Sequence, residues 1–282
     1  MHQLLNSPGK RLLALLFLGL TPLLANGQDV IRVARLSSPK LETRHPIDAA
    51  LEIARESLRH SQANINDYTA VFVKRCRVDG VLPPLQYANV KVRNRKTEDR
   101  LITTPMSVYL DFLKPKSVKG REVIWVENEN DGNLIVHQGG FASFFTTQIN
   151  PEGMLAMRGQ RYSIKEIGIE NLLQKIVETG LSDRQHGECD VRIDRDKNFG
   201  DVNCTMVEIT HPVKREHFRF CRARVYFDNN VNLPVRYQAW TWPDSPGGAL
   251  KLDEEYNYFN LEVNAGLSAS DFDSSNPEYR FR

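Results

Sequence analysis

The sequence predicts an α+β fold: a single curved antiparallel sheet, an open half-barrel of about ten strands, with two or three helices on its concave side. The first observation is that most apolar residues recur with a period of two, which is typical of strands. The second is that turn signals follow one another too closely for crossover helices, so neighbouring strands are expected to be antiparallel. The third is that two segments each carry one apolar stripe at helical spacing and must lie against another element.

Two amphipathic helices are predicted, one on each side of the first group of strands. The first covers residues 46–63, and Pro46 suits its first turn. The second covers residues 166–179, because Ser163 and the glutamate three residues later match a capping box. Gly180 fits a C-terminal stop for this second helix.

The strands are predicted from alternation and from the turn residues between them. Asp131 and Gly132 form a strong hairpin signal. Several strands are apolar on both faces, so we expect the sheet to curl and shelter one face. The expected strands are residues 68–73, 85–92, 106–113, 121–126, 133–137, 190–194, 202–210, 218–228, 233–241 and 250–263.

The N-terminus has the features of a cleavable export signal. In residues 1–27 a basic pair precedes the apolar run 12–20, and small residues follow at a cleavage site. This apolar run is shorter than the roughly 20 residues of a membrane-spanning helix. We therefore expect an exported protein of the periplasm or cell envelope without a transmembrane segment after cleavage. Residues 28–45 are expected to be a flexible tether, and residues 46–282 a single domain.

The charge balance excludes one class of partner. The full chain has 37 Lys and Arg residues against 35 Asp and Glu residues, and two of the basic residues belong to the predicted signal. The mature chain is then formally neutral. Nucleic acids require a basic surface, so we do not expect one as a partner.

Four cysteines follow the predicted signal, and an oxidising compartment allows up to two disulfides between them. Cys189 and Cys204 lie in one predicted hairpin around residues 194–200. If the hairpin places them opposite each other, they can form a disulfide, and this is the pairing that we predict.

We find no motif of a catalytic site, and the protein is predicted not to be an enzyme. The consecutive acidic residues Asp253, Glu254 and Glu255 lie on one strand, where side chains alternate between faces, so the three cannot all converge. His211 and His217 do not have the spacing of a metal site. We predict neither a metal nor a cofactor.

Aromatic and aliphatic residues at strand positions can form either an ordinary core or the wall of a ligand cavity. We predict that some line an apolar cavity on the concave face, under the two helices. The residues chosen from the alternation of their strands are Phe72, Leu110, Phe112, Ile124, Val225, Phe227 and Tyr237.

Several segments resemble a family of exported planctomycete proteins that is known only as domain of unknown function 1571. They are residues 67–140, 155–173 (LAMRGQRYSIKEIGIENLL), 207–212 (VEITHP), 223–228 (ARVYFD) and 233–240 (LPVRYQAW). Cys76 and Cys221 stand where the family pattern has Glu and His, so we expect both to be free thiols.

The order of elements also resembles the lipoprotein carriers of the LolA/LolB type. That resemblance implies a LolA/LolB-like domain over residues 46–282, with an open sheet that shelters acyl chains. It favours a non-enzymatic envelope protein that binds a hydrophobic ligand or a lipoprotein acyl chain. Two alternatives remain: a regulatory or sensor module that binds an envelope protein, and a hydrolase without a recognised motif.

Overall fold

The structure is a computed structural model that describes residues 44–140 and 145–281. Most of its strands are formed by the segments in which apolar residues recur with a period of two. The helices are α1 (Asp48–Asn64), α2 (Met154–Met157) and α3 (Ile169–Asp183), and the short 3₁₀ helices are η1 (Asn130–Gly132), η3 (Ile164–Glu166) and η4 (Ala269–Phe272). The strands are β1 (Asp67–Cys76), β2 (Gln86–Arg93), β3 (Lys96–Glu98), β4 (Leu101–Thr104), β5 (Ser107–Lys114), β6 (Glu122–Val126), β7 (Leu134–His137), β8 (Thr146–Ile149), β9 (Asp190–Phe199), β10 (Val202–Thr210), β11 (Arg222–Asp228), β12 (Leu233–Thr241) and β13 (Lys251–Val263).

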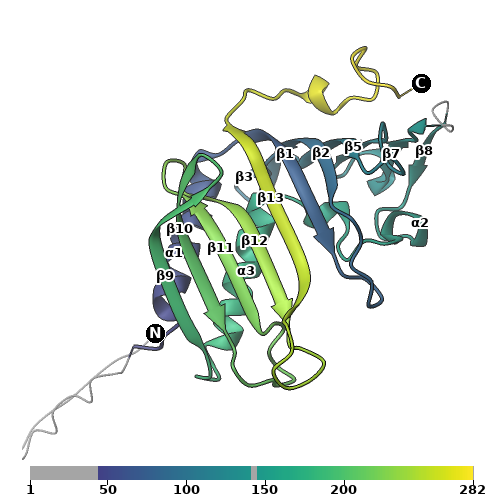
Figure 1. The fold of residues 1–282 in the computed structure, drawn as a ribbon. Coiled ribbons are helices and arrows are strands. Elements are labelled where there is room, and N and C mark those ends of the chain that lie inside the picture. Colours follow the sequence, from purple (N-terminus) through teal and green to yellow (C-terminus); the bar gives the residue numbers. More distant parts are fainter. Residues whose placement is uncertain (1–43, 141–144, 282) are drawn as a thin grey trace, which may run out of the picture. The chain divides into compact units, whose positions relative to one another are not determined.

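Eleven of these strands form one antiparallel sheet, in the order β8-β7-β6-β5-β2-β1-β13-β12-β11-β10-β9 (Figure 1). The sheet ends at β8 and β9 and is therefore open. Strands β3 and β4 pair separately as a small hairpin. The predicted α+β fold, a large open antiparallel sheet with helices, is confirmed.

The predicted signal peptide, residues 1–27, and the predicted tether up to residue 43 lie outside the described residues. Within the part of the chain that the structure describes, each helix is too short or too polar to cross a membrane.

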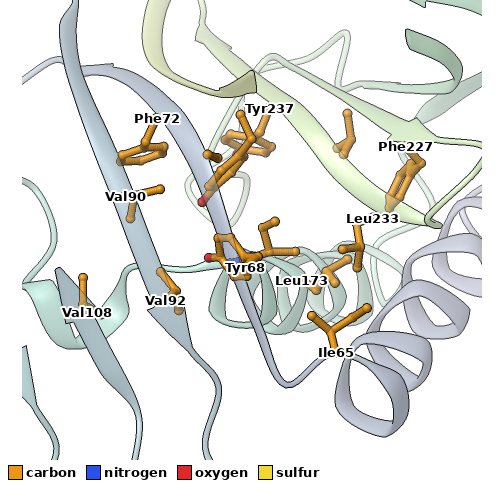
Figure 2. Packing of buried hydrophobic residues seen from close by; sticks show 14 of the residues in the cluster. Ile65, Tyr68, Phe72, Val90, Val92, Val108, Leu173, Phe227, Leu233 and Tyr237 are labelled. Atoms are coloured by element: carbon orange, nitrogen blue, oxygen red, sulfur yellow. The ribbon is translucent and has the colours of Figure 1, made fainter. Parts of the chain in front are cut away.

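Helices α1 and α3 lie on one face of the sheet, which we call the helix-covered face. Leu51 and Ala54 of α1 and Leu173 of α3 are buried in one cluster with side chains from most of the strands. Figure 2 shows that Tyr68 and Leu173 point into the same packed layer. The Tyr68 hydroxyl accepts a hydrogen bond of 3.0 Å from the Ile169 backbone N–H, which joins β1 to the first turn of α3.

The prediction that Gly180 ends the second helix was wrong. Helix α3 continues to Asp183, and Gly180 lies inside it, opposite α1. A Cβ atom at Gly180 would lie 2.7 Å from Leu51 Cδ2, so the glycine lets the two helices approach closely. The predicted capping box of Ser163 and Glu166 does form, but on η3 rather than on α3.

The opposite face of the sheet, the far face, is covered by the C-terminal segment (residues 265–281). Phe272 and Tyr279 of this segment pack on Tyr109, Ile124 and Val126 of β5 and β6. The Tyr109 and Tyr279 rings stack with their centroids 4.2 Å apart. Strands β5 and β6 are thus buried on both faces.

The predicted disulfide between Cys189 and Cys204 does not form, and both cysteines are free. The hairpin turns at Gly200 and Asp201, so Cys204 pairs with Lys197 while Cys189 lies before the far end of β9. The two positions are then roughly 25 Å apart along the ladder, far beyond the reach of a disulfide. Cys76 and Cys221 are free, as predicted.

Candidate functional site

A cavity of about 440 Å³ lies against the helix-covered face at strands β1, β5, β6, β7, β8 and β13. Residues 151–168, which include α2, form its opposite wall. Protein interiors rarely leave voids larger than a water molecule, so this volume is not a packing defect of ordinary size. The apolar side chains of the strands that line it are Phe72, Leu110, Phe112, Val123, Leu134, Val136 and Ile149.

Three of the predicted site residues, Phe72, Leu110 and Phe112, line this cavity together. Val225 and Tyr237 line a second, smaller cavity of about 60 Å³ under α3. Tyr162, Leu172, Lys175 and Tyr256 line both cavities. For Phe72, Leu110, Phe112, Val225 and Tyr237, contact with a ligand stays a prediction.

The two other predicted residues lie elsewhere. Phe227 is buried in the core beside the helices and lines neither cavity (Figure 2). Ile124 points to the far face, where it packs with Phe272 and Tyr279. All five residues of β6 are buried, so alternation could not indicate which of them face the helices. The choice of Ile124 as a concave-face residue was therefore wrong.

The main cavity also has polar groups that the sequence analysis did not select. Lys74 follows Phe72 on the same face of β1, and its ammonium donates a 2.5 Å hydrogen bond to Gln160 Oε1. Arg121 precedes Val123 on the same face, and its Nε donates to Gln138 Oε1 at 3.1 Å. Lys74 occupies a position of β1 at which the alternation predicts an apolar residue. A cation at such a position was the signal that could have identified it.

A buried carboxylate, that of Glu254, belongs to the wall of the smaller cavity. Glu254 on β13 accepts hydrogen bonds from the hydroxyls of Tyr162 and Tyr256, at 3.2 and 3.0 Å. Arg219 Nη2 donates to its other oxygen at 3.1 Å. Burial raises the pKa of the Glu254 carboxyl above its ordinary value, while Arg219 and Arg161 act in the opposite direction.

The expectation that the three consecutive acidic residues cannot all converge is confirmed, because Glu255 bonds to Arg75 and Arg236. Asp253 and Glu254 both lie near Arg161 Nη1, at 2.5 and 3.9 Å. The pairing of β12 with β13 has a bulge at Asp253, which interrupts the strict alternation there.

The thiol of Cys76 lines the main cavity and lies 3.0 Å from the Tyr256 hydroxyl. Burial raises the pKa of Cys76, so the thiol stays protonated near neutral pH. A protonated, buried thiol reacts slowly with electrophiles.

The raised pKa of Glu254 predicts a pH dependence of stability. The folded protein holds this proton more tightly than the unfolded chain, so the stabilisation is present below the ordinary value near 4.5 and is lost as pH rises through the raised pKa. We expect the stability of the native protein, relative to Glu254→Gln, to fall with rising pH in that window. Urea unfolding at a series of pH values from about 4 to 8 measures it.

The control for this experiment is Glu98→Gln, because Glu98 is exposed on the small hairpin. Its stability should stay parallel to that of the native protein across the whole pH range. If Glu254→Gln were equally parallel, the ionisation of Glu254 would not be coupled to folding.

The comparison with protein families identifies the chain. The model of a family described as "Protein of unknown function (DUF1571)" matches residues 65–281, which contain both cavities. The chain belongs to this family. The match starts just before β1 and includes the C-terminal segment, so the elements around the main cavity are family elements. No curated protein matches the chain.

Among solved structures, the chain is similar to the lipoprotein LppX of Mycobacterium tuberculosis, with 13% identity over 78% of this chain and 98% of that one and a TM-score of 0.41. A putative outer membrane lipoprotein-sorting protein domain from Vibrio parahaemolyticus has 13% identity, with 79% and 95% of the two chains covered and a TM-score of 0.37. The LolA superfamily protein NE2245 of Nitrosomonas europaea has 10% identity, with 78% and 97% covered and a TM-score of 0.29. These likenesses are remote and do not establish a function for this chain.

Proposed function

We propose that the protein is a non-enzymatic carrier or sensor of the cell envelope that binds a hydrophobic ligand, such as a lipid or a lipoprotein acyl chain, in the main cavity. The single observation that carries this proposal is the cavity of about 440 Å³ with apolar strand residues on one wall. Its volume falls in the range of ligand pockets, roughly 300–1,000 Å³. The envelope location rests on the export signal predicted in residues 1–27.

The construction of the second wall supports the same function. Residues 151–168 cover the cavity with one turn of α2, one turn of η3 and irregular chain, while the rigid sheet forms the floor. Leu155 of α2 belongs to the lining and is 76% exposed, so it lies at the rim of the cavity. A wall with few regular hydrogen bonds can move at low cost and admit a chain-like ligand.

The test is to place a charge on the apolar floor. We expect Leu110→Glu to abolish uptake of a fluorescent fatty acid, because Leu110 is 6% exposed and lines the cavity. An unpaired carboxylate there would exclude an acyl chain. Leu101→Glu makes the same chemical change at a position 71% exposed on β4 and should bind as the native protein does. Fluorescence titration measures both.

A second variant separates loss of binding from loss of fold. Ala156→Trp fills the cavity from α2 without burying a charge, since Ala156 is half-buried and belongs to the lining. It should reduce uptake while the circular dichroism spectrum stays native. Native uptake by both Leu110→Glu and Ala156→Trp would contradict the proposal.

Binding of an envelope protein is a second candidate, favoured by two large exposed apolar side chains on α2. Met154 and Leu155 of α2 are 88% and 76% exposed. Side chains of this kind can dock on a partner. Native mass spectrometry of protein purified from the envelope separates the two candidates, because a bound lipid supports the first and a lipid-free complex with a protein supports the second.

A further inference from the structure

Two partly buried cations that line the main cavity, Lys74 and Arg121, have no acidic partner within residues 44–140 and 145–281. Among the described residues, no carboxylate forms an ion pair with Lys74 or Arg121, which bond instead to the neutral amides of Gln160 and Gln138. Burial lowers the pKa of both side chains, which is the expected effect when a charge leaves water without compensation.

Two other cations of the lining have acidic partners, and Arg158 is exposed. Arg161 is paired with Asp253 at 2.5 Å, and Lys175 with Glu166 at 2.6 Å. Glu166 is the one acidic residue among the described residues that line the cavity. With Lys74 and Arg121 left over, the cavity carries excess positive charge.

The strand register places this charge at one end of the cavity. Phe72 and Phe112 lie in one row across the strands. Lys74 lies two residues beyond Phe72 on β1. Arg121 lies beside Phe112, whose N–H donates to the Arg121 carbonyl at 2.9 Å, so both cations border this row. The next row along the strands is apolar. It runs through the paired residues Leu110, Val123 and Val136.

We propose that the ligand of this cavity is an anionic amphiphile, whose carboxylate or phosphate binds Lys74 and whose acyl chain lies over Leu110, Val123 and Val136. This inference rests on the proposed function and specifies the chemistry of its ligand. Arg121 adds positive potential at the same end of the cavity. An anion would supply the counter-charge that Lys74 lacks, and charge-assisted hydrogen bonds are the strong ones in such sites.

The test compares two fluorescent ligands with the same acyl chain, a free fatty acid and its neutral methyl ester. The native protein should bind the acid about ten-fold or more tightly than the ester, the ratio that one charge-assisted hydrogen bond supplies. Lys74→Met should bring the two affinities together by weakening the acid while leaving the ester unchanged. Lys74→Arg should retain most of the preference, and Arg121→Met should lose part of it.

The matched control is Lys116→Met, a lysine that is exposed in the loop after β5 and outside the cavity lining. It should keep the native preference. Stability gives an independent readout, because removal of a partly buried ammonium without a counter-charge should not lower the melting temperature of Lys74→Met. If Lys74 were instead required for the fold, Lys74→Met would have a lower melting temperature than the native protein.

A lysophosphatidic acid with the same chain distinguishes the two sources of the anion. If the lysophosphatidic acid binds more tightly than the fatty acid, the natural head group is a phosphate. If it binds more weakly, the head group is a carboxylate. A preference for either anion that depends on Lys74 supports the inference. Equal affinities of the native protein for acid, phosphate and ester would overturn it while the proposed function stands. If none of the three ligands bound, the proposed function would itself fail.

Discussion

Replacement of Arg280 with alanine is expected to lower the free energy of unfolding by about 2–3 kcal/mol. The reason is Glu122, whose side chain is 3% exposed on the far face of β6. Its two oxygens accept 2.8 Å hydrogen bonds from the backbone N–H and the Nε of Arg280. Without the guanidinium, the buried carboxylate keeps the backbone donor of residue 280 but loses its counter-charge. Because Arg280 is half-exposed, water offsets part of the loss.

Chemical denaturation measures this effect, and two further variants interpret it. Arg44→Ala breaks a pair with Glu52 in which both side chains are about two-thirds exposed, and should cost below about 1 kcal/mol. Glu122→Gln in the Arg280→Ala background removes the buried charge and should restore most of the stability. If Arg280→Ala cost no more than Arg44→Ala, the C-terminal segment would not be anchored through Glu122.

Gly139→Ala is expected to destabilise the protein by about 3 kcal/mol. A Cβ atom at this position would lie 2.2 Å from the Lys119 carbonyl oxygen, 2.5 Å from Gly120 C and 2.6 Å from Arg121 N. These are backbone atoms, which cannot rotate away, so the loop before β6 must move. Arg121 lines the cavity, and the displacement should therefore also weaken ligand uptake.

Gly140→Ala is the matched control for this substitution. Its Cβ would meet no atom within 4 Å, and its cost comes from a φ of +69°, roughly 1–2 kcal/mol for a residue with a side chain. Thermal unfolding of the two variants should therefore place Gly139→Ala clearly below Gly140→Ala. If Gly140→Ala were the less stable of the two variants, the loop before β6 would move aside for the added Cβ atom at little cost.

Local periodicity was enough to predict most of the strands, because alternation reflects burial of one face. It failed where the far face is also buried. The segment that covers Ile124 is polar in sequence, and nothing in its composition predicts that Phe272 and Tyr279 turn toward the sheet. Strand β8 was not predicted, because Ile149 is the one apolar residue among its four residues. Only the pairing with β7 makes this segment a strand.

The candidate site was predictable in part for the same reason. Phe72, Leu110 and Phe112 follow from alternation in β1 and β5. Lys74 occupies the same phase of β1, but a search for apolar residues does not select a lysine. Gly180 was interpreted as a helix stop because the sequence near it shows no other reason for a glycine. The actual reason is the close approach of Leu51 on α1, more than a hundred residues earlier. Tertiary contacts of that kind leave no local pattern.

The position of β1 next to β13 also determines the order in which the chain can fold. Arg75 and Glu255 meet across this central ladder although 180 positions separate them. Closing such a loop costs about 2.5 kcal/mol more in chain entropy than closing a ten-residue hairpin. The hairpins on either side can form early from local contacts, whereas the joint between them must wait for nearly the whole chain. A topology dominated by so distant a pairing folds slowly, and during synthesis the two halves of the sheet remain separate until β13 emerges.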